Sequence, residues 1–168
     1  MNIRLATPDD AKALLAIYAP YVTDTAITFE IAVPTPEDFR SRITETLRKF
    51  PYLVAEEDGR LLGYAYAGTF RKRAAFNHCV EMSIYIDRDC RRHGIGSMLY
   101  EELEKRLMAM GIINLCASIA TAVNDPYITN QSELFHQRHG YVKVAHFHKC
   151  GYKFNRWYDM IWMEKLLK

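Results

Sequence analysis

The sequence lacks the features that several common protein classes require. It has no run of about 18 apolar residues, so no membrane-spanning helix is expected. The four cysteines form no Cys-x-x-Cys pair, which argues against a zinc or thioredoxin-type site. Their wide spacing fits reduced thiols in a cytoplasmic protein. Residues 1–4 do not begin a charged segment followed by an apolar one, so no signal peptide is expected.

The chain also lacks an excess of charge of either sign. Its 22 Lys and Arg residues nearly balance 20 Asp and Glu residues, and the net charge of +2 is too small to suggest a nucleic-acid partner. Of its 168 residues, 49% are hydrophobic and 25% are charged, as in ordinary globular proteins. We therefore expect one domain spanning residues 1–168, with no membrane or nucleic-acid partner and no resident metal.

The periodicity of apolar residues predicts strands and helices in a mixed order. Strands are expected at residues 3–6, 52–56, 61–70, 79–86, 113–120, 141–148 and 157–166. Two helices are expected to begin at the Thr-Pro stretches of residues 7–10 and 35–38, and two more to span residues 97–110 and 132–139. Asp58-Gly59 predicts a tight hairpin turn, and residues 149–156 predict a longer hairpin connection. This order favours an α/β fold with a mixed sheet of about seven strands and helices on both faces.

A glycine-rich stretch, Arg-Arg-His-Gly-Ile-Gly-Ser at residues 91–97, follows an expected strand and begins an expected helix. Glycine lets the backbone approach a phosphate closely, and the first amides of a helix point outward at the positive end of its dipole. The stretch lacks the Gly-Lys-Ser/Thr ending of a Walker motif and the three spaced glycines of a Rossmann motif. The remaining common pattern, Arg-x-x-Gly-x-Gly, resembles the acyl-CoA signature of the GNAT acetyltransferases.

The resemblance covers nearly the whole chain and points to the phosphinothricin N-acetyltransferase branch of that family. The stretches that carry it are Tyr-Leu-Val-Ala-Glu at 52–56, Gly-Tyr-Ala-Tyr-Ala-Gly at 63–68, Phe-Arg-Lys-Arg at 70–73, Val-Glu-Met-Ser-Ile-Tyr-Ile at 80–86, Asn-Asp-Pro at 124–126 and Cys-Gly-Tyr-Lys at 150–153. The resemblance implies the GNAT fold, a homodimer and acetyl-CoA as cosubstrate. It also implies direct acetyl transfer, in a ternary complex, to the amine of a small amino-acid-like substrate such as phosphinothricin, methionine sulfoximine or methionine sulfone.

Glu81 is the candidate general base. Acetyl transfer needs a neutral amine, because an ammonium group has no lone pair with which to attack a thioester. Glu81 lies in the otherwise apolar strand expected at residues 79–86, where a carboxylate is costly unless it is paired or faces a cleft. The family places its base at this position. The alternative is that strand alternation puts Glu81 on a solvated face.

The same strand and the glycine-rich stretch carry the expected cofactor contacts. In the family, the strand at residues 79–86 splays away from the strand at 113–120. The main chain of Ile84, Tyr85 and Ile86 then pairs with the pantetheine arm as if the arm were a strand. The residues expected to bind the pyrophosphate are Arg91, Arg92, His93, Gly94, Ile95, Gly96 and Ser97.

Three further residues match polar positions of the branch. Asn124 and Ser132 resemble its contacts to the lower pantetheine. Residues 127–131 are extra here, so Asn130 is an alternative to Asn124. His136 matches a histidine of the branch, and it either donates a proton to the leaving thiolate or fixes its helix against the sheet.

The acceptor pocket is expected between the loop that carries Phe29 and the loop of residues 70–76. Phe29 and Phe76 would form apolar walls, and Arg71 or Arg73 would hold a substrate carboxylate through a bidentate pair. The branch usually has Tyr at the position of Phe76. A surface-exposed basic loop is the alternative.

Two other functions stay open. A protein N-terminal or polyamine acetyltransferase would use the same scaffold, although Arg71 and Arg73 would repel a polycationic acceptor. A catalytically silent acetyl-CoA-binding module would keep the glycine-rich stretch but would have no use for Glu81 within a strand.

Overall fold

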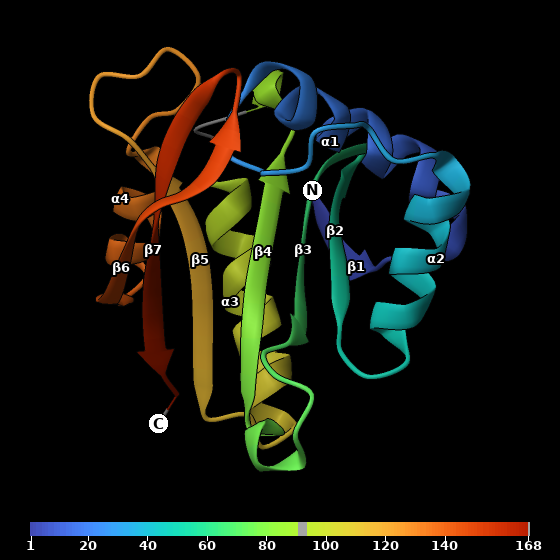
Figure 1. Ribbon diagram of the computed structural model, residues 1–168. Coiled ribbons are helices and arrows are strands. Elements are labelled where there is room, and N and C mark those ends of the chain that lie inside the picture. The colour runs from blue at the N-terminus through green and yellow to red at the C-terminus, as the bar shows by residue number, and fades with distance from the viewer. Residues whose placement is uncertain (91–93, 168) are drawn as a thin grey trace.

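Strands from both ends of the chain share one sheet in the computed structural model, which describes residues 1–90 and 94–167 (Figure 1). The strands are β1 (Asn2–Leu5), β2 (Tyr52–Glu57), β3 (Arg60–Thr69), β4 (Cys79–Ile86), β5 (Asn114–Thr121), β6 (Val142–Lys153) and β7 (Arg156–Leu166). Their order across the sheet is β1-β2-β3-β4-β5-β7-β6. The β4–β5 pair is parallel and the other neighbouring pairs are antiparallel. The expected mixed sheet is confirmed.

Helices cover both faces of this sheet. The helices α1 (Ala11–Asp24) and α2 (Pro36–Leu47) lie on one face, and α3 (Ile95–Ala109) and α4 (Gln131–Arg138) lie on the other (Figure 1). Alternate residues of β2 pack against the helices on opposite faces of the sheet, because successive side chains of a strand point to opposite faces. Leu53 and Ala55 belong to the core under α3, whereas Tyr52 and Val54 belong to the core under α1 and α2. No helix of the described residues is long and apolar enough to cross a membrane.

The expected helix starts are explained by local hydrogen bonds. At α2, the Thr35 hydroxyl accepts from the Asp38 amide at 3.1 Å, and the Asp38 carboxylate accepts from the Thr35 amide at 3.3 Å. Before α1, Pro8–Asp10 forms a short 3₁₀ turn, and the Asp10 carboxylate accepts from the Thr7 amide at 2.7 Å. Arg4 of β1 donates to both oxygens of Asp10 at 2.9 Å and lowers the pKa of that carboxyl group. These bonds fix the start of α1 against the first strand.

One hairpin matches the sequence prediction and the other does not. Asp58 and Gly59 have φ values of 51° and 78°, as a tight turn between β2 and β3 requires. The connection expected at residues 149–156 is shorter, because β6 continues to Lys153 and only Phe154 and Asn155 form the turn. Gly151 therefore lies within a strand. A Cβ atom there would lie 2.5 Å from the ring of Phe29, so close packing and not a turn explains this glycine.

Candidate active site

A cavity of about 700 Å³ opens where β4 and β5 diverge. The ladder between them covers three residues of each strand, Cys79 to Glu81 opposite Asn114 to Cys116. Beyond this point β4 stays paired with β3, and β5 stays paired with β7 (Figure 1). The diverging edges leave room for an extended ligand to pair with a strand. The expected splay is therefore present.

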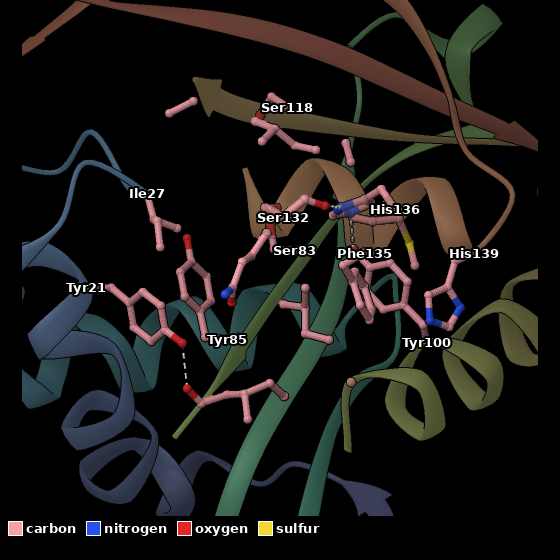
Figure 2. A pocket seen from close by; sticks show the side chains of 18 of the residues that line it. Tyr21, Ile27, Ser83, Tyr85, Tyr100, Ser118, Ser132, Phe135, His136 and His139 are labelled. Atoms are coloured by element: carbon pink, nitrogen blue, oxygen red, sulfur yellow. Dashed lines mark hydrogen bonds between the residues drawn. The ribbon is translucent and has the colours of Figure 1, made fainter. Parts of the chain in front are cut away.

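The main chain of β4 forms one wall of this cavity. Ile84, Tyr85 and Ile86 all line it. The hydroxyl of Tyr21 in α1 donates to the carbonyl oxygen of Ile86 at 2.6 Å, which holds the end of the strand in place (Figure 2). The positions predicted to meet a pantetheine arm thus lie at the cavity.

The N-terminus of α3 forms a second wall. Gly94 is the N-cap with a φ of 76°, and residues 94–97 line the cavity. The first amides of a helix lack intrahelical partners and sit at its positive end, so they suit an anion. At Gly96 a Cβ atom would lie 3.1 Å from the ring of Phe135, so glycine lets α3 approach α4 closely. Arg91, Arg92 and His93 lie outside the described residues.

Glu81 lies at the point of divergence, as the last residue of β4 that pairs with β5. Its side chain is half-buried and lines the cavity. The hydroxyl of Ser118 in β5 donates to its carboxylate at 2.7 Å. Sequence reasoning missed Ser118, although it is a hydroxyl residue within the otherwise apolar run 115–120. The carboxylate is thus held at a cleft and not on an open surface.

His136 is buried at the other side of the cavity, in α4, with an exposed fraction of 3%. Its Nδ1 faces the carbonyl oxygen of Ser132 at 2.7 Å, and its Nε2 faces the hydroxyl of Tyr100 at 2.9 Å (Figure 2). Because a carbonyl oxygen only accepts, Nδ1 carries the proton and Nε2 accepts from Tyr100. Burial lowers the pKa of His136 to about 4, so the ring is neutral at pH 7.

The loop after α1 closes another side of the cavity, and it carries Phe29, which was predicted to line an acceptor pocket. Thr28 and Phe29 line it, and the ring of Phe29 packs over Gly151 of β6. The neighbouring Lys153 donates to the carbonyl oxygen of Thr28 at 2.8 Å. The β6–β7 hairpin therefore supports the loop that carries Phe29.

The other predicted acceptor residues do not line the cavity. The guanidinium of Arg71 lies 4.4 Å from the centroid of the Phe70 ring and 5.9 Å from that of Trp162. Trp162 is the strand partner of Ser118 and shares its face of the sheet, so Arg71 lies near the Glu81 site without reaching into it. Phe76 packs edge-on against Phe70, and Arg73 is exposed at the start of the Ala74–Phe76 turn.

Asn124 also lies away from the cavity. It is exposed with a φ of 51°, in a turn whose next residue, Asp125, accepts from Tyr158 at 3.2 Å and from Arg156 at 3.2 Å. These contacts tie the turn to β7. Asn130 is exposed at the start of α4 and does not line the cavity either. Instead Ser132 does, together with Ile128 and Thr129 of the extra segment, which sequence reasoning did not identify.

Comparison of the sequence with models of known domain families identifies the family of this chain. The sequence model of the acetyltransferase (GNAT) domain matches residues 3–162. The chain belongs to the GNAT acetyltransferases. It is an acetyl-CoA-dependent N-acetyltransferase, and the helix terminus and the open strand edge at the cavity suit that cosubstrate.

Three similar proteins, one matched by sequence and two by structure, resemble this chain over nearly its whole length. A phosphinothricin N-acetyltransferase of Alcaligenes faecalis is 34% identical over 99% of this chain and 82% of its own length. The structure of a phosphinothricin acetyltransferase from Sinorhizobium meliloti in complex with AcCoA has a TM-score of 0.90 and 30% identity, over 99% of this chain and 88% of that one. A ribosomal-protein-alanine N-acetyltransferase from Brucella melitensis has a TM-score of 0.92 and 33% identity, over 99% and 100%.

Proposed function

We propose that this GNAT enzyme acetylates the amine of a small amino-acid-like substrate of the phosphinothricin, methionine sulfoximine or methionine sulfone type, by direct attack in a ternary complex. The observation that carries the proposal is the placement of Glu81. Its carboxylate, bonded to Ser118, faces the same cavity as the N-terminus of α3. Acetyl-CoA supplies the activated acetyl thioester. Glu81 takes the proton of the attacking amine, directly or through one water molecule.

The remaining cavity residues bind and orient the cosubstrate. The amides of Gly94 to Ser97 bind the pyrophosphate. Arg91, Arg92 and His93, which precede them in the sequence, would add positive charge to that contact. The main chain from Ile84 to Ile86 pairs with the pantetheine arm, and one of its amides polarises the thioester carbonyl. Ser132, which lines the cavity, takes the polar contact to the lower arm.

His136 acts in this proposal as a positioning residue. Of its two possible roles, proton donation to the thiolate is disfavoured, because its N–H is engaged by the Ser132 carbonyl and the ring is neutral at pH 7. Its contact with Tyr100 joins α4 to α3 at the cavity wall, and its contact with Ser132 fixes the ring within α4.

Arg71 is the residue that we propose to bind the carboxylate of the acceptor, since it lies on the side of the sheet that carries Glu81 and Trp162. An Arg71→Gln variant should raise KM for amino-acid acceptors and leave KM unchanged for the matching decarboxylated amines. An equal rise in KM for both acceptor types would show that Arg71 does not bind the acceptor carboxylate.

The base is tested by replacing Glu81 with Gln. Loss of a general base lowers rates by about 10²- to 10⁴-fold, so kcat at neutral pH should fall by that factor, while the Kd for CoA measured by calorimetry stays the same. The exposed Glu37→Gln variant in α2 is the control and should match the wild-type enzyme. Unaltered turnover in Glu81→Gln would show that another group is the base.

The acceptor class is tested by a panel of amines, with release of free CoA as the readout. Phosphinothricin, methionine sulfoximine and methionine sulfone should react, and polyamines should not. A protein N-terminus is the second candidate acceptor, because the ribosomal-protein-alanine N-acetyltransferase resembles this chain so closely. Reaction of alanine-terminated peptides together with failure of all three amino-acid analogues would favour that second candidate.

The edge of the sheet at β6 supports a homodimer. β6 is the last strand in the order, and Val142, Val144 and Phe147 are 60%, 51% and 49% exposed. An apolar strand edge of this kind is normally covered in solution. Light scattering should give the mass of two chains, and Val144→Glu should give the mass of one. A monomeric wild-type protein would contradict this assembly.

A further inference from the structure

The β6–β7 hairpin forms the sheet edge farthest from β1 (Figure 1). It contains a bulge opposite Asp159. Phe147 pairs with Met160 and Gly151 pairs with Tyr158, so residues 148–150 of β6 face the single residue Asp159 of β7. Lys149 in this bulge has a φ of 48°. A bulge re-aims the side chains around it, and here it turns polar groups of β6 toward Asp159.

Three metal-ligating side chains converge at this bulge. The Asp159 Oδ1 atom accepts from the Lys149 amide at 2.8 Å. Its Oδ2 atom lies 2.8 Å from His146 Nε2 and 3.1 Å from His148 Nδ1. The three candidate ligand atoms all lie within 4.8 Å of one another.

We propose that His146, His148 and Asp159 form a binding site for one divalent transition-metal ion, such as Zn²⁺, with water in the remaining position. Two imidazole nitrogens and one carboxylate oxygen suit Zn²⁺ and other divalent transition-metal ions, whereas Mg²⁺ and Ca²⁺ prefer oxygen ligands alone. No metal was expected from the sequence, where only the cysteine spacing was considered, and His146 and His148 lie on a different strand from Asp159. The bulge brings them together.

The observed spacing lies close to what zinc requires. Bonds of 2.0–2.2 Å in a tetrahedral site place neighbouring ligand atoms about 3.3 Å apart. The nitrogen–oxygen distances of 2.8 and 3.1 Å need to widen by only a few tenths of an ångström, and the two rings must move together. Both imidazoles are exposed, so their side chains can make this adjustment. The amide of Lys149 fixes the carboxylate through its other oxygen, as orienting partners of metal ligands do.

Such an ion would join β6 to β7 outside the catalytic cavity, which His146, His148 and Asp159 do not line. The same hairpin packs Gly151 under Phe29 and bonds Lys153 to Thr28. Metal binding should therefore stabilise the native state and make the hairpin that supports the loop carrying Phe29 more rigid. Without a metal, the two imidazoles make only exposed contacts with the Asp159 carboxylate, and exposed polar contacts contribute little to stability.

The test is calorimetric titration of untagged protein with ZnCl₂, accompanied by thermal unfolding. We expect one Zn²⁺ per chain and a rise in Tm of about 5–10 °C at a free zinc concentration about 100 times Kd. His146→Gln and His148→Gln should each weaken binding by at least about tenfold. Both variants keep the Lys149–Asp159 bond and so preserve the hairpin. The control is His78→Gln, at an exposed histidine whose ring contacts the Gly111 carbonyl, and it should bind zinc as the wild type does.

Several results would contradict the proposed metal site. Absence of binding heat with ZnCl₂, or equal affinity in the wild type and both histidine variants, would exclude these ligands. A Co²⁺ complex with a thiolate charge-transfer band that disappears in Cys150→Ser would assign the metal to a cysteine, since Cys150 is exposed in the same bulge. One ion per two chains would place the metal between copies of the protein and not within one hairpin.

Discussion

The buried His136 makes the stability of this enzyme depend on pH in a defined window. Its pKa falls from the ordinary value of 6.5 to about 4 because burial disfavours the charged ring. The unfolded chain therefore binds a proton at a higher pH than the folded chain does. Between pH 6.5 and about pH 4 the unfolded state holds more protons, so stability falls as the pH is lowered through this window.

The size of the effect follows from the same pKa difference. Each pKa unit corresponds to about 1.4 kcal/mol, so His136 alone should remove about 3 kcal/mol from the free energy of unfolding between neutral pH and pH 4. Burial also lowers the pKa of His139, which adds a loss in the same direction. The measurement must therefore compare variants and not rest on the wild type alone.

The assay is urea unfolding at pH 7 and at pH 4 for the wild type and His136→Gln. Glutamine removes the titrating ring and keeps a side-chain oxygen that accepts from Tyr100. The variant should be less stable at pH 7, and its deficit relative to the wild type should shrink by about 3 kcal/mol at pH 4. The exposed His78→Gln variant should follow the wild type at both pH values. A deficit for His136→Gln that stays constant with pH would refute the reasoning.

Two further substitutions test how the cavity walls are held. Ser118→Ala removes the hydrogen bond to Glu81, and kcat should fall by about tenfold while the Kd for CoA stays constant; an unchanged kcat would make that bond irrelevant to catalysis. Gly151→Ala places a Cβ atom 2.5 Å from the ring of Phe29, so it should raise KM for the acceptor amine and leave the Kd for CoA unchanged. The Phe29→Ala/Gly151→Ala double variant should be no worse than Phe29→Ala alone, and an additional loss would mean that the added methyl group acts elsewhere.

Local signals in the sequence predicted much of this fold correctly. Thr35 and Asp38 cap each other at the start of α2, and Asp58-Gly59 forms a tight turn, because these features depend on neighbouring residues only. The glycine-rich stretch was also predictable as the start of a helix, since Gly94 caps α3. Its place beside the diverging strands came from the family resemblance.

Features that depend on distant residues were harder to predict. Gly151 indicated a turn, but its reason is the ring of Phe29, more than a hundred residues earlier in the chain. Ser118 stood out only once β4 and β5 were aligned side by side. Asn124 matched a family position, but its turn is held to β7 through Asp125, while Ile128 of the extra segment reaches the cavity instead.

Calorimetric titration with CoA and with pantetheine tests the central claim most directly. If the amides at the N-terminus of α3 bind the diphosphate, CoA should bind with one site per chain. Pantetheine, which has no diphosphate, should then bind at least about 100-fold more weakly, because several hydrogen bonds to charged oxygens, each contributing about 1.5–3 kcal/mol, are lost. No binding heat with CoA, or equal affinity for the two compounds, would contradict the account.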